Sequence, residues 1–272
     1  MWSNVARVCR VALSVGLVFA FAVPLGAQTQ APLSDVPSLT SNRPGIGDSE
    51  ALVPARAFQL EAGAQFQEAP PASDLRSTQT WGQLTLRYGM TRRIEVFGGW
   101  DGLSLDRVLV DGASQVVAGG NDLRFGTKLA LLTEEAHGLT VTIAPAWSFP
   151  VGSEEFTSGS QDPSFRVLWA RSLPRDWSIS GNFLWVRTSD PIGRYWDNSV
   201  TLVVTRSLTE NLSVFVEGSN VLQAIRPDSL TIDGGLAWIV GRDRQLDFSA
   251  GHTLHDRGDD WFVSAGITLR RR

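Results

Sequence analysis

Nine charged residues lie at alternate positions of strand-like segments, on the side of each segment that carries the other polar residues. They are Glu61, Arg87, Glu95, Arg124, Lys128, Arg166, Glu217, Asp233 and Asp247. Because successive side chains of a β-strand point to opposite faces, this spacing gathers the charges on one common face. Two roles fit the pattern. The charges form either a selectivity ladder, with the cations across from the acids, or a structural network that links adjacent strands and fills the interior.

His252 is the strongest candidate for a general base, since it falls near the end of a strand-like run on the apolar face. A nucleophile must lie within hydrogen-bond distance of its base. The neighbours expected beside His252 on that face are Leu230, Trp261 and Val263. The nearby serines have the opposite parity: Ser229, Ser249 and Ser264. The spacing therefore disfavours a hydrolase, and we predict no enzyme activity.

Acidic residues also gather in the expected connections between strands. They include Asp111, Asp122, Asp256, Asp259 and Asp260. No spacing among them matches a dedicated calcium loop such as the EF-hand. We predict solvated loop charge, with no metal site and no cofactor; the alternative is that calcium links these carboxylates to lipopolysaccharide.

The first 27 residues have the layout of a secretory signal peptide. Arg7 and Arg10 accompany an apolar run from Val11 to Val23, and small residues follow. The only cysteine, Cys9, lies in this segment. The mature chain is therefore expected to lack thiols, which excludes disulfides and cysteine metal sites.

Composition and hydropathy exclude two further classes of protein. The chain has 28 Asp and Glu against 24 Lys and Arg, with no basic stripe, so no nucleic-acid partner is expected. A membrane-spanning helix needs about 20 apolar residues, and no later segment approaches that length. An α-helical membrane protein is thus excluded.

From Phe58 onward the sequence alternates with period two in twelve runs separated by turn residues. The runs are 58–67, 77–89, 93–101, 119–132, 138–148, 162–173, 176–187, 197–208, 211–220, 228–240, 244–253 and 260–270. Their connections alternate between tight turns and longer loops, the latter including 102–118 and 188–196. This arrangement is typical of an outer-membrane barrel.

One face of these runs is apolar throughout and ends in aromatic residues. Tyr88, Trp100, Trp147, Trp177, Trp185, Trp238 and Trp261 lie on that face near strand ends. Such rings form girdles at the level of lipid headgroups. Scattered aromatic core residues are the alternative, but a core would favour mid-strand positions.

Two tight hairpins yield register expectations. A turn centred on Thr91 sets Arg87 opposite Glu95. A turn centred on Asp243 sets Trp238 opposite Phe248, an aromatic cross-strand pair.

A spanning β-structure must close because hydrocarbon offers no partners to an open edge, so run 260–270 is expected to pair with run 58–67. Residues 28–57 then form a periplasmic leader, which Pro44 and Pro54 keep from continuing the sheet. The charged residues expected to act in this leader are Arg43, Asp48 and Glu50. We expect the leader to fold into the lumen as a short plug, with Arg43 pairing an inward carboxylate such as Glu61; the alternative is a flexible tail.

Two stretches resemble a known family. Asn42-Arg43-Pro44, Ser49, Val53-Pro54 and Gln59-Leu60-Glu61 with Gly63, and then Tyr88 to Glu95, are similar to the outer-membrane "transporter" or putative MetA-pathway of phenol degradation family. Members usually have Asp where this chain has Asn42, and they commonly end in an aromatic residue. The resemblance implies a barrel with an uptake role near the catabolism of aromatic compounds.

The sequence thus predicts an all-β protein: a single closed antiparallel transmembrane barrel of about twelve strands, residues 58–272, in a bacterial outer membrane. The expected function is passive passage of small molecules, including hydrophobic or aromatic compounds. The alternatives are a closed-lumen structural or surface-interaction barrel and, less favoured, a lipid-acting outer-membrane hydrolase. The expected partners are outer-membrane lipid, lipopolysaccharide and a small-molecule solute.

Overall fold

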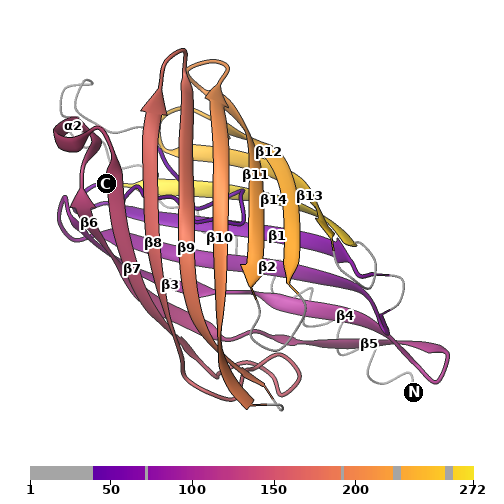
Figure 1. Cartoon of the computed structure of the whole chain (residues 1–272). Helices are drawn as coiled ribbons and strands as arrows, with labels where there is room; N and C mark the ends of the chain where they lie inside the picture. Colours follow the sequence, from indigo (N-terminus) through magenta and orange to yellow (C-terminus); the bar gives the residue numbers. More distant parts are fainter. Residues whose placement is uncertain (1–38, 71–72, 191–192, 223–227, 255–259) are drawn as a thin grey trace, which may run out of the picture. The chain divides into compact units, whose positions relative to one another are not determined.

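The computed structural model describes residues 39–70, 73–190, 193–222, 228–254 and 260–272. The predicted signal peptide, residues 1–27, and the start of the leader lie outside the described residues. The described part is almost entirely β-structure (Figure 1). None of its helices has the length and apolar character needed to cross a membrane.

Twelve antiparallel strands form a closed ring (Figure 1). They are β1 (Phe58–Glu68), β2 (Leu75–Gly89), β3 (Ile94–Trp100), β6 (Leu123–Leu132), β7 (Thr140–Phe149), β8 (Asp162–Leu173), β9 (Trp177–Asp190), β10 (Gly193–Ser207), β11 (Leu212–Leu222), β12 (Ser229–Ile239), β13 (Arg244–Leu254) and β14 (Asp260–Arg271). One short helix, α2 (Glu134–His137), forms the β6–β7 turn. The predicted twelve-stranded barrel is confirmed.

The ring closes where it was predicted to close. Strands β1 and β14 pair along their full length, from Phe58 opposite Arg271 to Glu68 opposite Trp261. Strand β1 also pairs with β2 on its other side. Every backbone edge at the seam is therefore paired, as a lipid environment requires.

The expectation of a long loop at 102–118 is wrong. These residues form a hairpin of β4 (Leu103–Val110) and β5 (Ala113–Gly120). Strand β4 follows β3 in the chain and pairs with the first half of β2. Its turn residues Asp111 and Gly112 both have positive φ, 51° and 76°. An Asp-Gly pair suits the two-residue type I′ turn that joins strands most tightly. Likewise, 188–196 is mostly strand, since β9 runs to Asp190 and β10 begins at Gly193.

The two predicted hairpin registers are each displaced by two residues. Arg87 lies opposite Phe97, and Trp238 lies opposite Leu246. The turns are centred one residue away from the expected positions, on Arg92 and Arg242. A shift of the turn centre by one residue changes the partner by two, so each side chain keeps its face.

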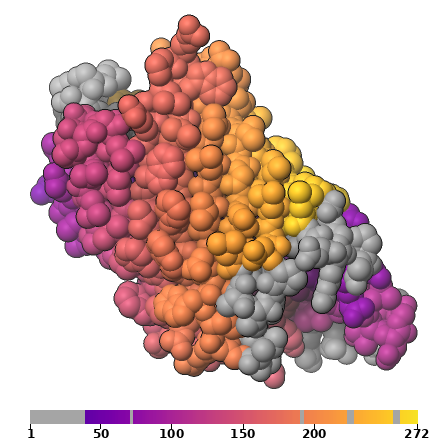
Figure 2. Space-filling model, viewed as in Figure 1, coloured from indigo at the N-terminus to yellow at the C-terminus, as the bar shows by residue number. Residues whose placement is uncertain are grey.

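The two faces of the barrel differ as the alternation predicts. Outward residues such as Leu86, Leu202 and Ile232 are exposed, at 52%, 47% and 52%. Inward positions are mostly polar, and many of these polar side chains are buried. The outer wall of β7–β13 is continuous in Figure 2. An apolar wall of this kind requires lipid around it, because contact between apolar side chains and water is unfavourable.

The predicted girdle residues occupy outward positions of their strands, and Trp177, at the start of β9, also lines the cavity inside the barrel. Trp147, Trp177, Trp185, Trp238 and Trp261 are exposed, while Tyr88 and Trp100 are half-buried. Tyr88 packs against Phe58 across the β1–β2 pair, with ring centroids 4.4 Å apart. Their role as headgroup anchors remains a prediction.

Candidate functional site

The leader, residues 39–57, lies inside the barrel and crosses its lumen. Leu39, Val53 and Ala57 are buried at 4%, 2% and 1% exposure. Its end is tied to the start of the barrel, since the Arg56 N–H donates to the Gly89 carbonyl and the Gly89 N–H donates to the Ala57 carbonyl. Prolines on both sides remove donors that a further strand would need. The leader's remaining polar groups meet inward side chains of the wall.

Arg87 is the centre of the densest contact between leader and wall. Its guanidinium forms ion pairs with Glu95, Nε to Oε1 at 2.7 Å, and with Glu61, Nη1 to Oε1 at 2.8 Å. Its Nη2 donates to the Ala51 carbonyl at 2.8 Å. Glu95 in turn accepts the Val53 N–H at 2.7 Å. Arg87 is fully buried, so removal of any one of these charged groups would leave another one buried without its partner.

Lys128, on β6, binds the leader beside this cluster. Its Nζ donates to Asn42 Oδ1 at 2.8 Å and to the Ser49 carbonyl at 2.6 Å. The Thr142 hydroxyl donates to the Glu50 carbonyl nearby, at 2.8 Å. One lysine therefore bridges two points of the leader that are seven residues apart.

Arg43 lies on the seam between β1 and β14. Its Nε pairs with Asp247 at 3.2 Å, and its Nη2 donates to the Ser264 hydroxyl at 2.7 Å. Beneath it, Gly63 and Gly266 face each other in register. A Cβ at either glycine would collide with the guanidinium. The two glycines thus provide the space that Arg43 occupies.

The middle of the leader, residues 45–48, reaches the opposite wall. Both oxygens of Glu217 accept backbone N–H groups, from Ile46 at 2.8 Å and from Gly47 at 2.7 Å. The Asp48 N–H donates to Asn182 Oδ1 at 3.1 Å. A Cβ at Gly45 would meet the Glu217 carboxylate, so a larger residue there would displace that side chain.

Asp48 forms an ion pair with Arg166, Oδ2 to Nη1 at 2.8 Å. Burial alone would raise the pKa of Asp48, but the positive charges of Arg166, Lys128 and Arg124 outweigh it and lower this pKa to about 2. Asp48 is therefore ionised at neutral pH, and its contact with Arg166 is a contact between two charges.

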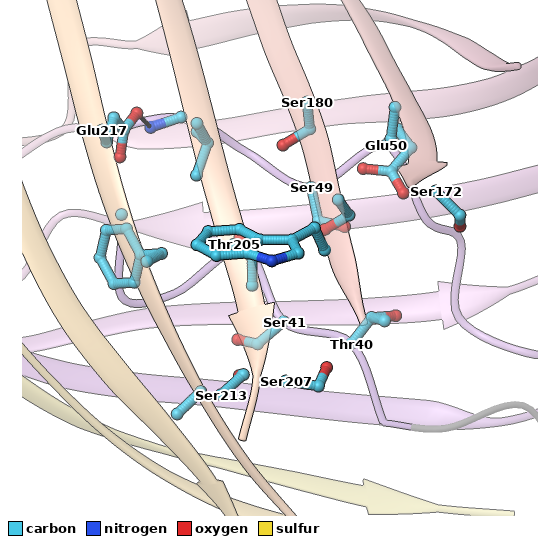
Figure 3. Close-up of a pocket in the computed structure, with 18 of the residues that line it drawn as sticks. Thr40, Ser41, Ser49, Glu50, Ser172, Ser180, Thr205, Ser207, Ser213 and Glu217 are labelled. Atoms are coloured by element: carbon cyan, nitrogen blue, oxygen red, sulfur yellow. Dashed lines mark hydrogen bonds between the residues drawn. The ribbon is translucent and has the colours of Figure 1, made fainter. Parts of the chain in front are cut away.

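The leader divides the lumen into cavities that its residues 43–48 separate. On the tight-turn side, a cavity of about 750 Å³ lies between the leader and strands β8–β11. Its hydroxyl-rich lining is visible in Figure 3 and includes Ser41, Ser49, Ser172, Ser180, Thr205, Ser207 and Ser213. On the long-loop side lie cavities of about 260 Å³ and about 380 Å³, and both are lined by Ile46. Residues Gly45 to Gly47 and Glu217 therefore stand as a septum between the inner and outer spaces.

The structure distributes the nine predicted lumen charges differently from a simple ladder. Glu61 and Glu95 lie beside Arg87 rather than across from it. Arg124 and Arg166 are half-buried, and Arg166 meets leader Asp48. Glu217, Asp233 and Asp247 are inward on β11, β12 and β13. Arg43 pairs with Asp247, whereas Glu61 accepts the backbone N–H of Asn42.

Neutral polar residues of the site escaped the sequence analysis. Asn182, Gln245 and Ser249 all contact leader backbone groups. Their alternation with outward apolar residues was a usable signal. Nothing in the sequence distinguished them from lumen-filling polar residues, since their partners lie about 130 or more positions away in the chain.

His252 is exposed on the outward face, as expected. The residue directly across from it on β12 is Ile232, not the expected Leu230, and the one on β14 is Trp261. Ser249 and Ser264 are buried on the lumen side. These positions separate the base from the nearby serines by the thickness of the wall.

Comparison with known proteins identifies a family and a fold. The family model described as "Putative MetA-pathway of phenol degradation" matches residues 41–270, which confirms the resemblance. The COG4313 outer membrane channel from Pseudomonas putida F1 is similar in structure: TM-score 0.61 and 14% identity, covering 84% of this chain and 99% of that one. The KdgM and NanC porins both give a TM-score of 0.53, at 7% and 10% identity. They cover 78% and 77% of this chain and 98% of their own. No curated protein sequence matches.

At these identities the structural likeness establishes the fold. A closed barrel with an apolar outer wall needs a bilayer and is a form that bacterial outer membranes contain. The chain is therefore an outer-membrane barrel.

Proposed function

The chain belongs to the family described as "Putative MetA-pathway of phenol degradation", and we propose that it provides passive, non-enzymatic passage for small solutes along the β8–β11 wall. The observation that carries this proposal is the position of the leader. It is held by buried charges on one side of the lumen, while the other side keeps a cavity of about 750 Å³.

The septum at Gly45 to Gly47 separates the inner cavity from the outer cavities on this route. It is fixed to the β9–β11 wall through Glu217 and Asn182. Displacement of these three residues would join the inner cavity to the outer cavities and leave the rest of the leader in place. We therefore propose the leader as a constriction rather than a complete seal.

The lining of the inner cavity suits a small solute with an apolar body and a polar end. Val203 and Phe215 provide apolar contacts among the hydroxyls of β9–β11. Pockets that bind small organic molecules combine such apolar lining with a few polar groups. This favours the hydrophobic or aromatic compounds that the family description suggests.

The alternative, a closed-lumen structural or surface-interaction barrel, is favoured by the same septum if it never moves. Planar-bilayer recording on refolded protein distinguishes the two. The wild-type barrel should give small discrete conductance steps. Arg43→Ala, which leaves Asp247 without its ion pair, should raise the conductance, while Arg92→Ala in the exposed β2–β3 turn should not. Silent bilayers with all three proteins would support the closed barrel.

A further inference from the structure

Asp233, in the middle of β12, is a buried carboxylate whose surroundings do not neutralise it. It is 3% exposed, and among the described residues neither of its oxygens has a hydrogen-bond partner. Buried charges are ordinarily paired or bound to a cation, because an isolated one is costly. Asp233 therefore indicates either a lost charge or an absent positive partner.

The residues opposite Asp233 on the two neighbouring strands supply no positive charge. Glu217 lies directly opposite on β11, and Gly251 lies opposite on β13. The guanidinium of Arg43 pairs with Asp247 on the next strand, β13. Two carboxylates thus face each other across adjacent strands, and like charges so placed destabilise a sheet unless something lies between them.

A second oxygen without a partner lies on the other side of Glu217. The Thr201 hydroxyl, on β10, is 4% exposed and has no hydrogen-bond partner among the described residues. Both Thr201 Oγ1 and Glu217 Oε1 approach the same point above Gly47, at 2.8 Å and 3.0 Å from where a Cβ would lie. The Asn182 Nδ2 approaches that point as well, at 2.9 Å. The partner of Thr201 on β11 is Ser219, the next inward position after Glu217, so oxygens without partners lie on both sides of β11.

The leader covers this group of oxygens. The Pro44 carbonyl accepts the Ser249 hydroxyl on β13, and the N–H groups of Ile46 and Gly47 bind Glu217 on β11. Residues 44–47 consequently pass over β12, the strand between them. Asp233 becomes accessible when the septum moves.

We propose that Glu217 and Asp233, with the Thr201 hydroxyl at the edge, form a binding site for a monovalent positive charge, an alkali-metal ion or a small ammonium group, and that the site makes the passage cation-selective. Hydroxyl and carboxylate oxygens are the ligands that hard cations prefer. Both oxygens of Glu217 already accept backbone N–H groups, so Asp233 is the carboxylate left without a partner, and this favours a single positive charge. The proposal rests on the proposed passage for its functional consequence, though not for binding.

Reversal potentials in an asymmetric potassium chloride gradient test the selectivity. Wild-type protein should favour potassium over chloride. Asp233→Asn, which keeps the shape and removes the charge, should move the reversal potential toward zero. Asp106→Asn, which removes a lumen charge on β4 away from the septum, should leave it near the wild-type value. A wild-type reversal potential that Asp233→Asn does not change would overturn the proposal.

Binding is tested separately, so that a silent bilayer does not decide it. The unfolding temperature of refolded protein is compared in potassium chloride, methylammonium chloride and choline chloride at equal ionic strength. Stabilisation by potassium alone identifies an alkali-ion site, and stabilisation by methylammonium as well identifies a site that also accepts amines. Both gains should be absent in Asp233→Asn. Equal unfolding temperatures in the three salts would overturn the site, whereas failure to conduct in every variant would overturn only the passage.

Discussion

The two sides of the lumen are built on different principles. On β1–β3, β6 and β7 the leader meets the wall through buried charges, with Arg87 binding Glu61, Glu95 and the Ala51 carbonyl. On β8–β11 the wall carries mainly hydroxyls and surrounds a cavity of about 750 Å³. The leader touches that side chiefly through residues 46–48.

One side of the lumen anchors the leader, and the other is the side along which we propose that solutes pass. Arg87 has no exposed surface, so any movement of the leader there would leave charges buried without partners. Movement of Gly45 to Gly47 alone costs two backbone hydrogen bonds to the Glu217 carboxylate, each with a net value of about 1.5–3 kcal/mol, and leaves the Asp48–Arg166 ion pair in place. We therefore expect motion to concentrate at the septum.

The largest effect is expected from breaking the anchored side. Arg87→Gln should lower the free energy of unfolding by about 3–5 kcal/mol, because it leaves Glu61 and Glu95 buried together without their cation. Urea titration followed by gel mobility measures this change. Thr205→Val on the cavity side is the control and should remain close to wild type; equal losses would remove the contrast between the two sides.

A change at the seam should loosen the leader without unfolding the barrel. In Gly63→Ala the new methyl displaces the flexible end of Arg43, so single-channel conductance should rise while stability stays within about 1 kcal/mol of wild type. Gly218→Ala is the matched control, because a Cβ at Gly218 meets nothing within 4 Å. Identical conductance in the two variants would contradict a constricting role for Arg43.

Filling the cavity side should have the opposite effect on flux. Ser180 lines the inner cavity, whereas its neighbour Ile179 has the opposite parity and faces outward. Ser180→Phe should reduce conductance, and Ile179→Phe should not, with little change in stability for either. If Ser180→Phe conducts like wild type, solutes do not pass along β8–β11.

The smallest effect is expected at the position where this chain departs from its family. Asn42 Oδ1 now accepts a hydrogen bond from Lys128 Nζ at 2.8 Å. Asn42→Asp would place a carboxylate there, attracted by Lys128 and repelled by Glu61, which accepts the backbone N–H of the same residue. Attraction and repulsion nearly offset each other, so stability should change by about 1 kcal/mol or less. A gain well above that would show that Lys128 lacks sufficient negative charge in this chain.

Local patterns in the sequence accounted for the barrel wall. Alternation assigned each strand its lumen and lipid faces, and even a turn centred one residue off left Arg87 and Trp238 on the correct faces. The β4–β5 hairpin was also readable, since Asp111-Gly112 between alternating apolar residues is a strong turn signal. The sequence therefore contains the signal for this hairpin.

The sequence by itself thus determined which residues face inward, because a period of two is a property of neighbouring residues in one strand. Only the tertiary structure decided which inward groups meet. Arg43 pairs with Asp247, 204 positions away, because closure of the ring brings β13 and β14 beside β1. Glu217 receives Ile46 and Gly47 because the leader crosses the whole lumen. Such contacts follow from the curvature of a closed sheet, which no local pattern encodes.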